Sequence, residues 1–348
     1  PIRKDGLMNL DAFTVRNLEI FASLATQGTH GTLIDVLDET NTAGGGRLLR
    51  SWLYRPLTDL LTIQDRHNAV EGFVQDKNRL SDLRSELKEL TDLERALGKL
   101  SKHILTPREL FGFRLSLDRI PGISLILKDS SHSQCQKLSE TFKDVSKITE
   151  EINTILADDP PAKLSQIGVI RNGVNAELDD LRALSTSGKQ WIADLQSQER
   201  EKTGINSLKI GFNRVFGYFI EVTKANQDLV PEDYIRKQTL VNSERYITPD
   251  LKEYEEKILS ADERICEIES KIYFTLCDHI LSEAKSIQVN AHVLNRLDVL
   301  STFAQVAIDH HYCKPEMVEE NVINLNESRH PVVEQLLPVT DRFVPNDL

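Results

Sequence analysis

Cysteine is scarce in this chain of 348 residues, and its few thiols form no recognisable site. The four are Cys135, Cys266, Cys277 and Cys313. They form no CxxC pair and no cluster with histidine at zinc-binding spacing. The neighbouring His310 and His311 also lack metal-ligand partners at helical spacing. We therefore predict no metal-binding residue, and reduced thiols typical of a cytoplasmic protein.

Long apolar runs and an excess of positive charge are also missing. No stretch approaches the roughly 20 apolar residues that a membrane helix needs, so we expect no contact with a membrane. The net charge is −12, which excludes a protein that coats DNA through an overall basic surface. A negative net charge still permits nucleic-acid binding, because binding depends on a local basic surface.

Catalytic motifs are equally hard to find. The sequence has no G-x-x-x-x-G-K-[ST] loop, and the triplet at residues 44–46 lacks the lysine that would reach a phosphate. We interpret that triplet as a flexible break before a helix that ends at Pro56. Acidic pairs at residues 179–180 and 255–256 lie in helical stretches and are interpreted as solvated faces. No catalytic residue is predicted.

What the sequence does contain is helical periodicity. Apolar residues spaced three and four apart predict amphipathic helices. Leucines between residues 80 and 100 predict one helical seam, and Thr106 and Glu109 form a capping box for a helix ending near Pro121. Further helices are expected over residues 135–157, 175–202, 251–287 and 290–311, and the segment from residue 322 is expected to be strand-like.

Helical spacing disappears between residues 207 and 248, where β-branched and aromatic residues predict strands. A hairpin is expected around residues 214–217, with further strands at 234–242 and 245–248. The sequence thus places a small β module between two long helices. Because the chain must enter and leave the module close together, we expect those helices to form an antiparallel stalk. Its seam would contain Trp191, Leu195, Ile258, Ile265 and Ile272.

The β module is the least acidic part of the chain. Residues 207–248 hold six cations and five anions, a net charge of +1, so the remainder carries −13. Neutral hydrogen-bonding side chains such as Asn213 and Asn242 accompany the cations, and such groups suit phosphate oxygens. The pattern alone leaves two interpretations open: ordinary surface charge, or a contact with DNA.

Several long strings within and beside the module resemble one family. Residues 207–213, 216–222, 234–240 and 244–255 are similar to the MutS family of DNA mismatch-repair proteins. The flanking strings at residues 10–19, 45–57, 92–95, 328–334 and 342–347 agree with it. The resemblance covers essentially the whole chain. It implies an internal piece of such a protein, without the mismatch-reading domain and without the phosphate-binding loop.

The resemblance implies a mainly α fold, in which a long-helix core and an antiparallel lever stalk carry a small inserted antiparallel β clamp. The expected domains are a helical core (1–174), an outbound lever helix (175–206), the β clamp (207–249), returning lever helices (250–311) and the start of a truncated ATPase domain (312–348).

The implied function is DNA mismatch repair, through non-sequence-specific clamping of duplex DNA and transmission of ATP-driven conformational change. The expected DNA contacts are Lys209, Asn213, Arg214, Lys224, Arg236, Lys237, Gln238 and Asn242. Phe343 and Val344 would belong to an incomplete nucleotide pocket. A helical scaffold that never touches DNA is the alternative.

The complete protein would use ATP and magnesium as a DNA-dependent ATPase, whereas this stretch would hold no cofactor and hydrolyse nothing. The implied partners are duplex DNA containing mismatches, a second subunit of a dimer and a downstream MutL-type repair factor. The implied location is the cytoplasm, in association with the nucleoid.

Overall fold

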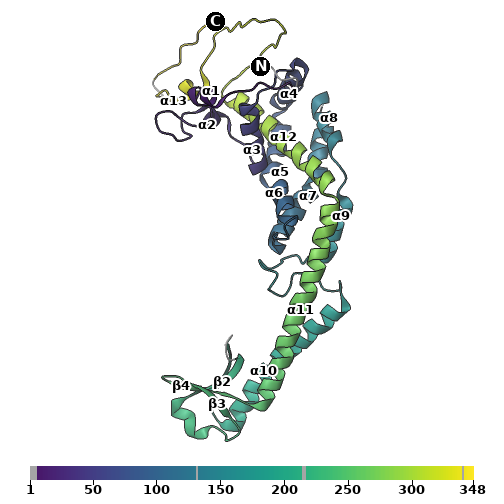
Figure 1. Ribbon diagram of the computed structural model, residues 1–348, viewed down its shortest axis with the longest axis vertical. Coiled ribbons are helices and arrows are strands. Elements are labelled where there is room, and N and C mark those ends of the chain that lie inside the picture. Colours follow the sequence, from purple (N-terminus) through teal and green to yellow (C-terminus); the bar gives the residue numbers. More distant parts are fainter. Residues whose placement is uncertain (1–5, 131, 214–216, 339–340) are drawn as a thin grey trace. The chain divides into compact units, whose positions relative to one another are not determined.

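A computed structural model of the protein describes residues 6–130, 132–213, 217–338 and 341–348. The chain divides into two compact units. The first comprises Pro1–Leu105, Gly112–Glu150 and His279–Leu348, and the second comprises Thr106–Phe111 and Glu151–Asp278. Both are mainly helical, and the second contains a small antiparallel sheet (Figure 1). The predicted fold class is confirmed. Among the described residues, no helix combines the length and apolarity that a bilayer crossing needs.

The first unit is built from helices. Those that lie wholly within it are α1 (Ala12–Asn17), α2 (Leu33–Leu37), α3 (Ala43–Tyr54), α4 (Leu60–Gln75), α5 (Lys77–Lys88), α6 (Leu93–Leu100), α8 (Ser133–Thr141), α12 (Ala284–Asp309) and α13 (Pro331–Leu336). Helix α12 is the central element: α3, α4, α5 and α6 pack against it. Half of its residues are buried, which explains why its sequence is apolar on several faces.

The glycine triplet is not a break, so that expectation was wrong. It forms the first turn of α3, which Thr42 caps by accepting a hydrogen bond from the amide of Gly45. A Cβ on Gly44 would overlap the Asn295 side chain, and one on Gly45 would overlap Asp298. Glycine is needed here because the start of α3 lies directly against α12.

The expected leucine helix is two helices, α5 and α6. Asp92 interrupts the seam because its side chain accepts from the amide of Arg95 and starts α6. The leucines still face one core: Leu83, Leu87 and Leu100 are fully buried. Periodicity therefore identified the buried face correctly and missed the break within it.

Two other helix ends also differ from expectation. Helix α7 (Pro107–Lys128) begins at the predicted capping box but runs through Pro121. The exposed Pro121 is tolerated while Leu117, Ile123 and Leu127 remain buried, which offsets the missing amide.

The helix expected over residues 135–157 is divided into α8 and α9 (Ser146–Ile155). Between them, the side chain of Asn290 accepts from the amide of Lys143 and donates to its carbonyl. A side chain from α12 thus satisfies the backbone where the helix stops.

The expected boundary between the last two long helices was also displaced. It falls at Glu283, whose φ of −97° and ψ of 11° lie outside helical geometry. The segment from residue 322 is not a strand either. Its described part has one isolated bridge, between Ser328 and Asn346, and the short helix α13.

The second unit contains two long helices and a four-stranded sheet. Its elements are α10 (Ala176–Thr203), β1 (Lys209–Asn213), β2 (Gly217–Thr223), the 3-10 helix η1 (Lys224–Leu229), β3 (Ile235–Thr239), β4 (Ser243–Ile247) and most of α11 (Pro249–Ser282). The strands lie in the order β1-β2-β4-β3 and every neighbouring pair is antiparallel.

Contacts between α10 and α11 show that the two helices run antiparallel. The rings of Trp191 and Tyr254 stack with centroids 3.5 Å apart, and nearer the start of α10 Ser185 donates to Asp262 at 2.5 Å. Moving back along α10 therefore means moving forward along α11. Leu195 and Ile258 share a buried cluster with residues of the sheet, and Ile265 is fully buried.

Candidate nucleic-acid interface

The sheet is fixed to α10 and α11 by hydrogen bonds as well as by apolar packing. Helix α10 ends at Gly204, whose φ of 70° reverses the chain toward β1. The side chain of Gln196 then accepts from the amide of Ile210 at 2.8 Å, and Arg200 donates to the carbonyl of Leu208 at 2.7 Å. These bonds set the register of the edge strand against the helix.

One face of the sheet packs toward the helices. Ile210 lies opposite Ile220, and Ile220 lies opposite Tyr246, so the three side chains share that face. The full buried cluster consists of Ile192, Leu195, Ile205, Leu208, Ile220, Val222, Tyr234, Tyr246, Leu251 and Ile258. Side chains alternate along a strand, so the intervening residues are on the outer face.

A cation stacked on an aromatic ring occupies the outer face. The guanidinium of Arg245 lies 4.0 Å from the centroid of the Phe219 ring, and its Nε donates to Glu221 at 3.0 Å. Phe219 in turn covers Gly211, where a Cβ would be only 2.8 Å from the ring. Arg245 also donates to the amide oxygen of Gln238 at 3.0 Å. This group is satisfied within the protein.

Arg236, one of the expected DNA contacts, is also paired internally. It lies opposite Tyr246, and its guanidinium is 3.4 Å from the buried carboxylate of Glu244. Glu244 accepts from the hydroxyl of Tyr246 at 2.5 Å as well. The Tyr246 hydroxyl, and then Arg236, hold the pKa of Glu244 below its usual range. Arg236 therefore balances a buried charge.

The lysines of the module are different. Lys209, Lys224 and Lys237 are all exposed, and none forms an ion pair with another described residue. Lys237 lies at a bulge, where the pairing of β3 with β4 shifts between Arg236 and Gln238. Three solvated ammonium groups thus remain available to an outside partner.

The expected contact residues are divided between two ends of the sheet. At one end, the amide of Lys224 donates to the carbonyl of Asn242 at 3.1 Å. Lys209 lies opposite Glu221, which is also in the half of the sheet nearer to that end. Asn213 pairs with Gly217 at the other end. Arg214 lies outside the described residues.

The residues expected at a nucleotide pocket lie in the first unit. Val344 is 74% exposed and Phe343 is half-buried. The nearby Asn346 pairs with Ser328 through hydrogen bonds in both directions. Within the described residues, no group of three or more His, Cys, Asp or Glu side chains is placed to hold a metal ion.

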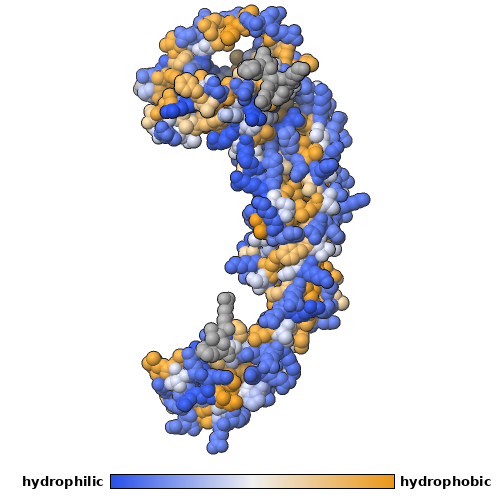
Figure 2. All heavy atoms as spheres, in the orientation of Figure 1, coloured by the Kyte–Doolittle hydropathy of each residue, from blue (hydrophilic) through white to orange (hydrophobic). Residues whose placement is uncertain are grey.

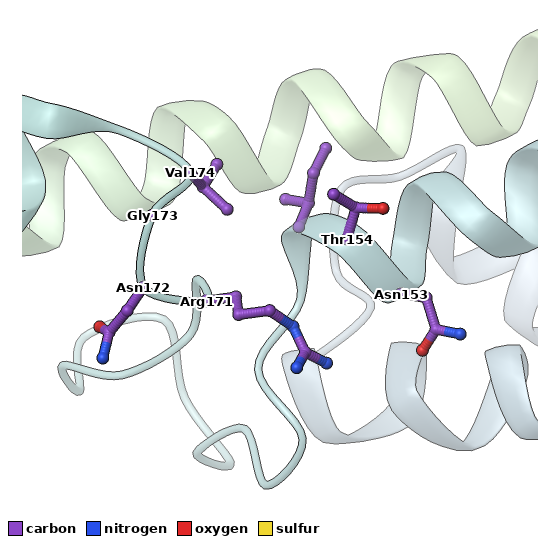
Figure 3. Close-up of a pocket in the computed structure, with 7 residues that line it drawn as sticks. Asn153, Thr154, Arg171, Asn172, Gly173 and Val174 are labelled. Carbon is purple, nitrogen blue, oxygen red and sulfur yellow. The ribbon is translucent and has the colours of Figure 1, made fainter.

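Sequence reasoning missed a pocket in the second unit. Figure 3 shows Arg171 extending between the end of α9, which carries Asn153 and Thr154, and the loop that carries Asn172 and Gly173. The guanidinium of Arg171 donates to Asp158. The two segments meet because Leu156 and Ile170 form an isolated bridge. No local sequence pattern predicts this pairing of distant segments. The pocket has a volume of about 670 Å³ and is lined by Asn153, Thr154, Ile155, Arg171, Asn172, Gly173 and Val174.

The surface of the sheet module is mainly hydrophilic. Figure 2 shows polar residues over most of its visible face, interrupted by small apolar patches. Exposed apolar residues in the module include Ile235 and Val241. The module therefore offers a polar surface with solvated lysines.

Comparison with known proteins identifies the family. The family model "MutS domain III" matches residues 13–304. A protein of Salinibacter ruber named DNA mismatch repair protein MutS is 46% identical over 345 residues, which is 99% of this chain and 38% of that protein. Proteins of the same name from Symbiobacterium thermophilum and Chlorobium chlorochromatii are 44% and 42% identical, over 98% of this chain and 39% of each relative.

The chain thus spans about two fifths of the length of these relatives, between 38% and 39%. The family match covers the helices from α2 to α11, most of α1 and α12, and the whole sheet module, whereas α13 lies beyond it. This chain belongs to the MutS domain III family.

Proposed function

We propose that this chain is the core, lever and DNA-contacting part of a DNA mismatch-repair protein. Its sheet module would hold the phosphates of duplex DNA without reading the bases. Two observations support the proposal: the relatives are named as DNA mismatch repair proteins, and the module presents exposed lysines that form no ion pair within the described part of the chain.

The lysines are the observation that carries the proposal. Phosphate contacts from lysine position a protein on DNA and confer no sequence preference. Lys209, Lys224 and Lys237 are solvated, so a phosphate would not have to displace an internal carboxylate. Arg236 and Arg245 would have to leave Glu244 and Glu221 first. We therefore assign the contacts to the lysines, with Asn242 and Gln238 as neutral groups, while Asn213 would contact DNA from the other end of the sheet.

Helices α10 and α11 suit a second role, the transmission of ATP-driven conformational change to the module. The stacked Trp191 and Tyr254 and the buried Ile258 join them beside the sheet, so the sheet would move with the pair. ATP and magnesium would bind elsewhere in the complete protein. Its partners would be mismatched duplex DNA, a second subunit and a MutL-type factor, in the cytoplasm.

The test is a titration of duplex DNA against the 348-residue chain at two salt concentrations. The variant replaces Lys209, Lys224 and Lys237 by glutamine, and the control is Lys257→Gln, which removes a lysine that pairs with Glu253. Each lost phosphate contact should reduce the slope of log K against log salt by about 0.9. Matched and mismatched duplexes should be affected equally.

Two results would contradict the proposal. A triple variant with the parental salt slope would show that the lysines do not contact phosphate. A chain that shows no salt-dependent binding at all would favour the alternative, a helical scaffold that does not touch DNA. Adding ATP to the same preparation tests the remaining expectation, because the chain lacks the phosphate-loop motif and should not hydrolyse it.

A further inference from the structure

Two half-buried arginines lie together in the first unit, away from every residue assigned above. Arg66 belongs to α4, and its guanidinium lies 3.4 Å from the centroid of the Trp52 ring on α3. Arg296 belongs to α12, which packs against both α3 and α4 (Figure 1). Trp52 packs against the buried cluster that contains Val299, one turn after Arg296, so both arginines lie beside that cluster, and the charge of Arg296 acts on Arg66. Such a pair is unfavourable unless something balances it.

Neither arginine has a hydrogen bond or an ion pair in the described part of the chain. Other arginines of the same unit do: Arg47, for example, binds Asp92 and Glu94. Burial, and then the nearness of Arg296, lower the pKa of Arg66 to about 10. Burial also lowers the pKa of Arg296. The ten N–H donors of the two guanidinium groups are thus left to solvent or to a ligand.

The acidic side chains nearby are engaged elsewhere. Asp65 is within electrostatic reach of Arg296 but accepts a hydrogen bond from Gln134 of α8. Glu71 binds Lys314 at 2.8 Å. In the described part of the chain, no carboxylate therefore lies within ion-pair distance of either arginine.

We propose that Arg66 and Arg296 bind a phosphate-class oxyanion. Guanidinium groups present rigid forks of donors that match phosphate oxygens, and stacking on Trp52 holds the fork of Arg66 in one orientation. A dianion balances both charges, whereas a single carboxylate balances one. The site lies in the first unit, whereas the proposed DNA-contacting lysines lie in the second, so either assignment stands without the other.

Tryptophan fluorescence gives a direct test, because the chain has only two tryptophans. In a Trp191→Phe chain, Trp52 is the single reporter and lies beside the proposed ligand. Inorganic phosphate should change its emission in a saturable way, beyond the effect of chloride at equal ionic strength. Arg66→Gln and Arg296→Gln should each weaken the response about tenfold or more, because each removes charge-assisted hydrogen bonds.

A matched control is Arg264→Gln, which removes an arginine paired with Glu177 and Glu267 in the second unit and should leave the response intact. Adenosine monophosphate in place of phosphate separates two sources of the ligand. If both ligands reach half of the fluorescence change at the same concentration, the site binds a bare phosphate. If adenosine monophosphate does so at a lower concentration, the site binds a nucleotide. Thermal melting of the unsubstituted chain with and without phosphate provides a second readout.

The proposal is overturned if chloride reproduces the phosphate effect. It is also overturned if both glutamine variants respond to phosphate as the parent does. If the fluorescence variant fails to fold, the melting experiment decides: no rise in melting temperature with phosphate, relative to chloride, refutes the site.

Discussion

The buried carboxylate of Glu269 offers the sharpest test of how the second unit is held together. It lies on α11 and is fully buried. It accepts from the guanidinium of Arg182 on α10 at 2.5 Å, and from the amides of Gly168 and Val169 at 3.0 and 3.2 Å. A single carboxylate thus joins the other long helix and the loop that precedes it.

Replacing Glu269 by alanine should cost far more than the loss of an exposed pair. The side chain of Arg182 is only 15% exposed, so its charge would be left without its buried partner. Removing one member of a buried ion pair costs about 3–5 kcal/mol. The two orphaned amides add to that cost. Glu269→Gln keeps the shape and one acceptor, so its effect should be smaller.

The assay is urea unfolding of a Trp52→Phe chain, in which Trp191 on α10 reports on the second unit alone. We expect Glu269→Ala to lower the free energy of unfolding by about 3–5 kcal/mol. The control is Arg264→Ala, which breaks an ion pair with Glu177 whose side chains are 53% and 57% exposed. That change should leave the free energy of unfolding nearly unchanged, because solvent screens an exposed ion pair.

A double-mutant cycle decides whether the two side chains act together. If Glu269 and Arg182 form one unit, the variant with both replaced by alanine should be much less unstable than the sum of the single variants. Additive effects would refute the reasoning. So would a Glu269→Ala chain whose midpoint matches that of the Arg264→Ala control.

Three further predictions follow from the packing. Ile265→Asp puts a charge at a fully buried position of α11, so it should lower the melting temperature of the second unit and weaken DNA binding. If the helical circular dichroism, the melting temperature and the DNA affinity were all unchanged, the paired-helix arrangement would be wrong. Gly45→Ala forces a methyl group against Asp298 and should cost about 1–3 kcal/mol as overpacking, whereas Gly98→Ala, where a Cβ meets nothing, should be neutral or stabilising in thermal melts. Because Tyr246 and Arg236 lower the pKa of Glu244, its stabilising effect is complete above the usual carboxyl pKa and is lost as pH falls through the lowered value; Glu244→Gln should therefore flatten the acid side of a plot of melting temperature against pH, and a parallel curve would contradict this.

Local sequence patterns were sufficient to predict the long helices and the β module. The capping box at Thr106 and Glu109 starts α7 where predicted. The change from helical to alternating spacing after residue 206 marks the sheet, because a strand buries every second side chain and a helix buries every third or fourth. These features depend on neighbours in sequence.

What the sequence did not show depends on residues far apart in the chain. Gly44 and Gly45 had the composition of a flexible break, yet they start a helix because Asn295 and Asp298 lie against them. The pair of Glu269 with Arg182 is likewise invisible in a linear pattern.

The same holds for the candidate site. The cations of the module can be identified from the sequence, and their local net charge of +1 distinguishes this region from the acidic remainder of the chain. Only the strand register showed that Arg236 and Arg245 are neutralised by Glu244 and Glu221. The sequence determined which charges are present, whereas the tertiary structure decided which of them remain available, because ion pairs form between residues that folding alone brings within a few ångströms.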